Sequence, residues 1–303
     1  MSLAAKLPFR HRHAAGFPGL GSQAVPTDAD ALDYLDRMAA ADGASVEVGV
    51  ATAVDAFVAD AKELGVFSAL KACCILAGAR TLAGALVPVV GDAPTNVADG
   101  FVEGDFSRTA GLTGDGTSYI DSGRANDDGP QNDRHLSVYV SSASTQGRAF
   151  AGSTDRSVPP TRALLLYWSS NQISADVQSS TSAQAAYTGG ETFIGASRSS
   201  SASQSLRINN ASQTDEFSSL GTYSRNEFVF ARNDSDSTFE ISDATIAFYS
   251  FGTSLSLEDL DTAVTNLINR LKFALLVGEN PSGLDPDTID YIVRGYEAGG
   301  SLE

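Results

Sequence analysis

The amino-acid sequence predicts an α+β protein: a small N-terminal helical module, then an antiparallel β-sandwich, then a C-terminal amphipathic helix. Three observations predict this order. Apolar residues recur at helical spacing over residues 28–78. From 105 to 142 the spacing changes to the alternation of strands, separated by turns rich in Gly, Asn and Asp. Helical spacing returns over 255–276.

The helical module is predicted to contain three helices joined by short loops. Thr27 or Asp28 can cap the first helix, which ends near Gly43. A second apolar stripe covers 46–61, and a third, shorter one covers 66–75 and stops before Gly78. Residues 79–100 then read as a linker with one apolar strand at 85–90.

The sandwich is predicted over 101–276, including the closing helix. Many short strands separated by polar turns are typical of two packed antiparallel sheets. Ser256 can cap the closing helix, because Asp259 follows three residues later. A tail over 277–303 carries a short helix candidate at 286–296. The strand candidates are 135–140, 148–152, 162–168, 172–177, 192–195, 205–209, 227–231 and 245–251.

Composition limits the partners and the compartment. With 20 Lys and Arg against 37 Asp and Glu, the formal net charge is −17, which argues against nucleic acid and anionic membranes as partners. No apolar run reaches the roughly 18 residues that span a bilayer. The two cysteines, Cys73 and Cys74, are neighbours and provide no disulfide framework, so we expect synthesis in a reducing cytoplasm.

Residues 1–27 are predicted to form an extended basic arm. The arm has no acidic residue and is rich in Pro and Gly, which argue against regular structure. One interpretation is a disordered tail. The other is a docking arm that lies along an acidic neighbour, because its charge is opposite to that of the body. The candidate docking residues are Lys6, Phe9, Arg10, Arg12 and Phe17.

No set of residues predicts an enzyme. A catalytic triad needs a histidine in the folded body, and His135, beside Asp133 and Arg134, is better explained as a surface or capping residue. Glycoside hydrolysis needs two carboxylates at a fixed separation. The closest spacing, Glu240 with Asp243, lies at a turn, where we expect both side chains to be solvated.

No cofactor is predicted, and calcium is the one metal to consider. Its ligands would come from a polar loop-rich stretch, but the spacings match no EF-hand, and acid-rich loops are usually solvated. Aromatic rings could stack on a sugar, although Trp168 lies in the most apolar strand and is expected in the core. The acidic candidates are Asp115, Asp121, Asp127, Asp128 and Asp133; the rings are Tyr167, Trp168, Tyr187 and Tyr223.

Three motifs carry a family resemblance. They are LAGARTLAGALVPVVG at 76–91, GLTGDGTSYIDSGRAN followed by PQNDRHLSVYVS within 111–142, and AFYSFGTSLSLEDL at 247–260. Together they resemble structural proteins of tailed bacteriophages, cyanophages among them. The resemblance covers 28–142 well and the rest in outline. It implies a helical leader before a concanavalin A-like, LamG-like jelly roll, and a location in the virion.

The resemblance therefore predicts a non-enzymatic virion protein, and two roles compete. A capsid decoration or cement protein, attached by its arm and helical module, would be a homo-oligomer that contacts the major capsid protein. A tail-fibre or tail and neck adhesin would instead bind host-surface glycan with its jelly roll. The chain lacks the repetitive shaft of a fibre, which favours decoration. A polysaccharide depolymerase ranks last for want of paired catalytic carboxylates.

Overall fold

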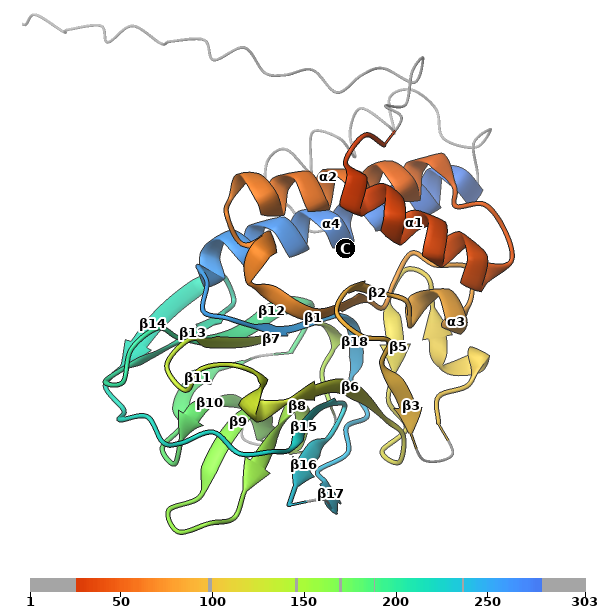
Figure 1. Ribbon diagram of the computed structural model, residues 1–303. Helices are drawn as coiled ribbons and strands as arrows, with labels where there is room; N and C mark the ends of the chain where they lie inside the picture. Colours follow the sequence, from red (N-terminus) through yellow and green to blue (C-terminus); the bar gives the residue numbers. More distant parts are fainter. Residues whose placement is uncertain are drawn as a thin grey trace, which may run out of the picture.

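The computed structural model describes residues 26–97, 100–144, 147–168, 171–187, 189–235 and 237–279. Within these ranges, two β-sheets pack face to face and a layer of helices covers the outer face of one of them (Figure 1). The sandwich, the helices before it and the helix after it confirm the predicted α+β class.

The first long helix begins and ends, and the last long helix begins, at residues that the capping rules indicate. The carboxylate of Asp28 accepts hydrogen bonds from the backbone N–H groups of Asp30 and Ala31, and Gly43 ends this helix in the left-handed conformation (φ 65°). The Ser256 hydroxyl accepts from the N–H of Asp259 at 3.3 Å. None of the described helices has the length and apolar character needed to cross a bilayer. The helices are α1 (Ala29–Asp42), α2 (Val48–Glu63), the short α3 (Leu82–Ala85) and α4 (Leu257–Glu279).

The first sheet, sheet A, lies beneath the helices. Its central strands, β7 and β18, are antiparallel neighbours, and β18 also pairs with β1. In order, its main path is β14 (Ala211–Asp215), β13 (Gln204–Ile208), β12 (Thr192–Arg198), β7 (Arg134–Ser142), β18 (Thr245–Gly252), β1 (Leu70–Ile75) and β2 (Pro88–Val90), with β5 (Gly111–Thr113) and β4 (Phe106–Ser107) beside it.

The second sheet, sheet B, lies on the side of sheet A away from the helices (Figure 1). Its main path is antiparallel, and β16 adds one short parallel pairing with β8. In order, it contains β11 (Ala183–Ala186), β10 (Gln172–Ser179), β9 (Thr161–Trp168), β8 (Arg148–Asp155), β15 (Asn226–Val229), β6 (Tyr119–Ala125) and β3 (Thr95–Val97), with β16 (Arg232–Asp234) and β17 (Ser237–Phe239) beside it.

Two hydrophobic cores lie on opposite faces of sheet A. The inner core fills the space between the sheets and contains Val138 and Phe251. The outer core lies between sheet A and the helices, where Phe248 of β18 meets Phe57 of α2 with ring centroids 5.9 Å apart. A buried ion pair, Arg207 Nε to Asp261 Oδ2 at 2.7 Å, also joins β13 to α4. The helices are therefore packed on the sandwich through a shared core.

The predicted third helix over 66–75 is wrong. Leu70–Ile75 forms strand β1, between β18 and β2. Cys73 and Ile75 point into the outer core, whereas Ala72 and Cys74 point into the inner core. Because both faces of β1 are buried, its sequence is apolar almost throughout, and spacing alone cannot distinguish it from a buried helix.

The predicted linker over 79–100 contributes to both sheets. The strand expected at 85–90 is shorter than predicted, because α3 ends at Ala85 and β2 covers only Pro88–Val90. Thr81 starts α3, since its hydroxyl accepts from the N–H of Gly84 at 3.1 Å. Further along, β3 pairs with β6 in sheet B.

Candidate functional site

The outer face of sheet B is the large sheet face that no described helix covers (Figure 1). Side chains alternate along β9: Leu165 and Tyr167 enter the inner core, while Leu164 and Leu166 form a small separate cluster with Ala149. Leu164 and Leu166 are only 1% and 5% exposed, although they lie on the outward side. The surrounding polar side chains therefore cover this apolar cluster.

A hollow of about 210 Å³ opens on this face, and we call it the sheet B hollow. Leu164 and Leu166 lie at its apolar side. Its polar lining comes from four neighbouring segments: Arg162 of β9, Ser174 and Asp176 of β10, Ser182 and Gln184 at β11, and Arg232 and Glu240 at the β16–β17 hairpin.

One wall of the hollow is organised around the carboxylate of Asp176. This residue is 1% exposed. It accepts hydrogen bonds from Arg162 Nη2 at 3.2 Å and from the Ser182 hydroxyl at 3.0 and 3.1 Å. Burial raises the pKa of Asp176, and the neighbouring Arg162 guanidinium opposes that rise. The Arg162 pairing compensates the charge that burial would otherwise disfavour.

A second buried carboxylate, Asp234, holds Arg232, which lines the hollow. Its side chain is 2% exposed and binds Arg232 at 2.9 Å. Arg156 contacts the same carboxylate through two nitrogens, at 2.6 and 2.8 Å. The Arg156 guanidinium also lies over the ring of Phe239, 4.8 Å from its centroid. Arg232 pairs in turn with Glu240, Nη1 to Oε2, at 3.1 Å.

The predicted docking residues cannot be placed, because Lys6, Phe9, Arg10, Arg12 and Phe17 lie outside the described residues. The helix candidate at 286–296 lies outside them as well.

The aromatic rings considered for sugar stacking do not line the hollow. Tyr167 and Tyr187 pack edge to face in the inner core, with centroids 5.7 Å apart. The hydroxyl of Tyr223 donates to the carbonyl of Ser153 at 2.8 Å. Trp168 closes strand β9, and its side chain lies outside what the structure describes. The three described tyrosines therefore have structural contacts.

The interpretation of His135 as a surface or capping residue is wrong. His135 is 2% exposed beneath the helix layer. Its Nδ1 donates to the carbonyl of Thr253 at 2.6 Å, so Nε2 is the acceptor for the Ser250 hydroxyl at 2.9 Å. Burial lowers the pKa of His135 to about 4. Its ring has no open side toward solvent, so its described role is structural.

Three of the acidic loop residues, Asp115, Asp121 and Asp133, accept hydrogen bonds from neighbouring polar groups. Asp115 accepts from the N–H groups of Thr117 and Ser118, both at 2.7 Å, and these bonds hold its pKa at about 2. Asp121 binds the side-chain amide of Asn226, and Asp133 binds Ser254. Among the described residues, no three His, Cys, Asp or Glu side chains gather in a metal-binding group.

Glu240 and Asp243 are not the solvated pair that the sequence predicted. Glu240 is half-buried against Arg232 in the wall of the sheet B hollow, and Asp243 accepts a hydrogen bond from the Ser144 hydroxyl. In the folded chain, Glu240 lines the sheet B hollow together with Asp176, a carboxylate from a different strand.

Sequence reasoning missed Asp176 and Arg162 as partners. The available pattern was an acidic residue in the middle of one strand candidate, 172–177, and a basic residue at the start of the preceding one, 162–168. In a hairpin, such residues come to the same face when the register places them opposite or diagonal to each other. The register, Asp176 opposite Leu164, sets Arg162 on the diagonal.

Comparisons with known proteins identify no family. No family model matches the chain, and no curated protein does. Among solved structures, the NanB sialidase of Streptococcus pneumoniae is 11% identical over 50% of this chain and 26% of its own, with a TM-score of 0.40. The binding domain of botulinum neurotoxin serotype D is 11% identical over 68% of this chain and 52% of its own, with a TM-score of 0.43.

The receptor binding domain of botulinum neurotoxin mosaic serotype C/D is 12% identical over 65% of this chain and 50% of its own, with a TM-score of 0.43. The chain thus spans from about a quarter to about half of the length of these structures. These are partial likenesses in a β-sandwich and assign no activity or ligand to this chain.

Proposed function

We propose that this chain is a non-enzymatic structural protein of a tailed-phage virion, most simply a capsid decoration or cement protein. The motifs at 76–91 and 111–142 resemble such proteins. In this proposal the helix layer and the basic arm face the particle, and sheet B faces outward. The adhesin and the depolymerase are the alternatives.

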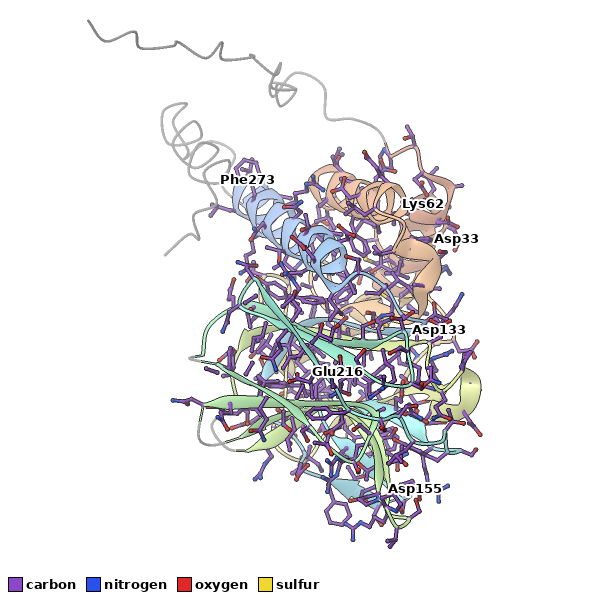
Figure 2. The ribbon with its side chains drawn as sticks, turned by 90° about the vertical axis from the view of Figure 1, so that its left-hand side faces the viewer. Asp33, Lys62, Asp133, Asp155, Glu216 and Phe273 are labelled. Atoms are coloured by element: carbon purple, nitrogen blue, oxygen red, sulfur yellow. The ribbon has the colours of Figure 1, made fainter. Side chains whose placement is uncertain are left out.

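The observation that supports the proposal is that both ends of the described chain lie on the helix side of the molecule, away from sheet B. The described chain begins at Pro26, just before α1, and ends at Glu279, the last residue of α4. Both of these ends therefore belong to the helix layer (Figure 1). Asp155, at the end of β8, lies at the opposite end of the molecule from Asp33 and Lys62 of the helix layer (Figure 2). Attachment through the helix side would leave sheet B free.

The test is the copy number of this chain per virion, measured by quantitative mass spectrometry against the major capsid protein. A decoration protein is expected in hundreds of copies, whereas a tail or neck protein is expected in a few to a few tens. Absence from purified particles would contradict the proposal altogether.

A second measurement tests the arm. Replacing Lys6, Arg10 and Arg12 with Glu should abolish association with particles, because the arm would then repel an acidic neighbour. The matched control, Lys6→Arg with Arg10→Lys and Arg12→Lys, keeps the charge and should associate normally. Equal association of both variants would exclude charge as the basis of docking.

A further inference from the structure

The helix layer carries an uncharged patch where α2 begins and α4 ends. Gly49 of α2 lies so close to Ala274 of α4 that a Cβ added to Gly49 would be 2.8 Å from the Ala274 Cβ. The start of α2 and the end of α4 are therefore in direct contact. The uncharged residues beside this contact form what we call the α2–α4 patch: Val48, Thr52 and Ala56 on α2, and Phe273 and Val277 on α4.

Helix geometry turns this patch outward. Its three α2 residues are each four apart, and the other face of the same helix is buried in the outer core. Figure 2 shows Phe273 on the side of α4 away from the sheets. Leu276 follows Ala274 by two residues, about 200° around the helix, so it lies on the side away from α2 and outside the patch.

The patch meets solvent in the part of the chain that the structure describes. Val48 is 52% exposed, and Phe273 and Val277 are half-buried. The outward face of α1 instead carries charged residues, Asp33 and Asp36 among them. An amphipathic helix normally turns such charged residues to water. An uncharged, partly apolar face in this acidic chain therefore points to a covering partner.

The sequence after α4 provides a segment that fits this patch. Asp285 can cap a helix that starts at Pro286, and the pattern predicts an amphipathic helix over 286–296. An isolated helix shorter than about 12–15 residues is marginal in water, so this one needs a surface to pack on. Its apolar residues follow at i, i+3, i+4 and i+7: Ile289, Ile292, Val293 and Tyr296.

Chain length allows this segment to reach the patch. Six residues, 280–285, join Glu279 to Pro286 and span at most about 20 Å. Phe273 lies six residues before Glu279 in α4, which is about 9 Å along the helix axis. Pro281 and Gly283 in the connection favour a turn. The segment can therefore fold back beside the end of α4.

We propose that residues 286–296 dock on the α2–α4 patch of their own chain, with their apolar stripe against it. A short connection gives the segment an effective concentration in the millimolar range. Its own chain is therefore favoured over a second copy at micromolar concentration. The inference goes beyond the proposed function and does not depend on it. Docking is measured on the purified chain, so it can fail while the virion copy number holds, and the reverse.

The experiment measures how fast a thiol in the patch reacts with a maleimide in the full chain. Val48→Cys supplies this thiol, because the native Cys73 and Cys74 are buried. Adding Ile292→Asp and Val293→Asp should raise the rate about tenfold, since a segment docked about 90% of the time leaves the thiol open about a tenth of the time. Equal rates with and without the two aspartates would overturn the inference.

Leu64→Cys is the matched control. Leu64 is 37% exposed and lies at the other end of α2, about 24 Å from Val48 along the helix. The predicted segment is about 16 Å long and does not extend to it from the start of α2. The two aspartates should leave the reaction rate of this thiol unchanged. An equal gain at Leu64→Cys and Val48→Cys would overturn the assignment to the patch.

Two further readings distinguish the chain's own segment from a second copy. Protection of Val48→Cys should persist on dilution from about 100 µM to about 1 µM, because intrachain docking does not follow mass action between copies. Loss of protection on dilution would assign the patch to a second copy. Oxidation of the double variant Val48→Cys/Ile292→Cys should link the two thiols within one chain. A disulfide between two chains would show exchanged segments and overturn the inference.

Discussion

His135 and Asp176 are ionisable residues that the fold removes from water and holds in different ways. Asp176 has a charged partner in Arg162, so its carboxylate can remain ionised in the wall of the hollow. His135 has only neutral partners at its two nitrogens, the Thr253 carbonyl and the Ser250 hydroxyl. Protonation of His135 would therefore place an uncompensated charge beneath the helix layer.

This difference predicts a pH effect on stability. The pKa of His135 is about 4 in the folded chain against 6.5 as its ordinary value, so between these values the unfolded state binds more protons. Stability that is present above pH 6.5 is then lost as the pH falls to 4, by about 3 kcal/mol for 2.5 pKa units. The measurement is the free energy of unfolding in urea at pH 7 and pH 4.

His135→Gln provides the comparison for that measurement. The variant loses the titrating group, so its stability should fall by about 3 kcal/mol less between the two pH values. The carboxylates are common to both proteins, and their contributions cancel in the difference. Equal losses in the two proteins would show that His135 does not titrate in this window.

At the level of elements, α4 joins the helices to the sandwich. It packs on α2 and sheet A, and Leu267 lies fully buried in the outer core, whereas Leu276 on the same helix is 43% exposed. Arg270 of α4 also pairs with Asp60 of α2 at 2.8 Å. We therefore expect the helices and the sandwich to unfold as one unit.

Leu267→Ala tests this expectation. It should lower the free energy of unfolding by roughly 2–5 kcal/mol, because it leaves a cavity in the outer core. Leu276→Ala, the matched control, should change it by no more than about 0.5 kcal/mol. Urea transitions followed by helical circular dichroism and by the fluorescence of Trp168 in β9 should shift together. Separate transitions would show an independent helical module.

At the scale of the whole molecule, sheet A is the layer on which both cores are built. β18 is buried along its entire length, and β7 is buried from Arg134 to Val140. Sheet B has one core face and one outward face, and the sheet edges at β14 and β11 are partly exposed. Protection from solvent should therefore decrease away from β7 and β18.

Native-state hydrogen exchange measures that gradient. Amides of β7 and β18 should exchange slowest, with opening free energies close to that of global unfolding. Amides of β14 and β17 should exchange through local opening, because these short strands have few buried neighbours. Exchange of β7 or β18 before the edge strands would contradict a structure centred on sheet A.

Strand prediction was most successful where side chains alternate or where the run is too short for a helix. Every strand candidate from 135 to 251 overlaps an observed strand, and the helix at 255–276 matches α4. The very short strands β4, β16 and β17 carry too few residues for a pattern. None of the residues lining the sheet B hollow was predicted as a site, because they come from separate strands and a hairpin.

The sequence by itself determined the α+β class, a cap for the first helix at Thr27 or Asp28, its end near Gly43 and the cap of the last helix at Ser256, because these depend on local periodicity and hydrogen bonding. Only the tertiary structure decided that 70–75 is a strand, that His135 is buried and that Arg162 and Asp176 meet. These three outcomes depend on which distant segments pack against the residues concerned. Strand register and the packing of the two cores decide which segments those are.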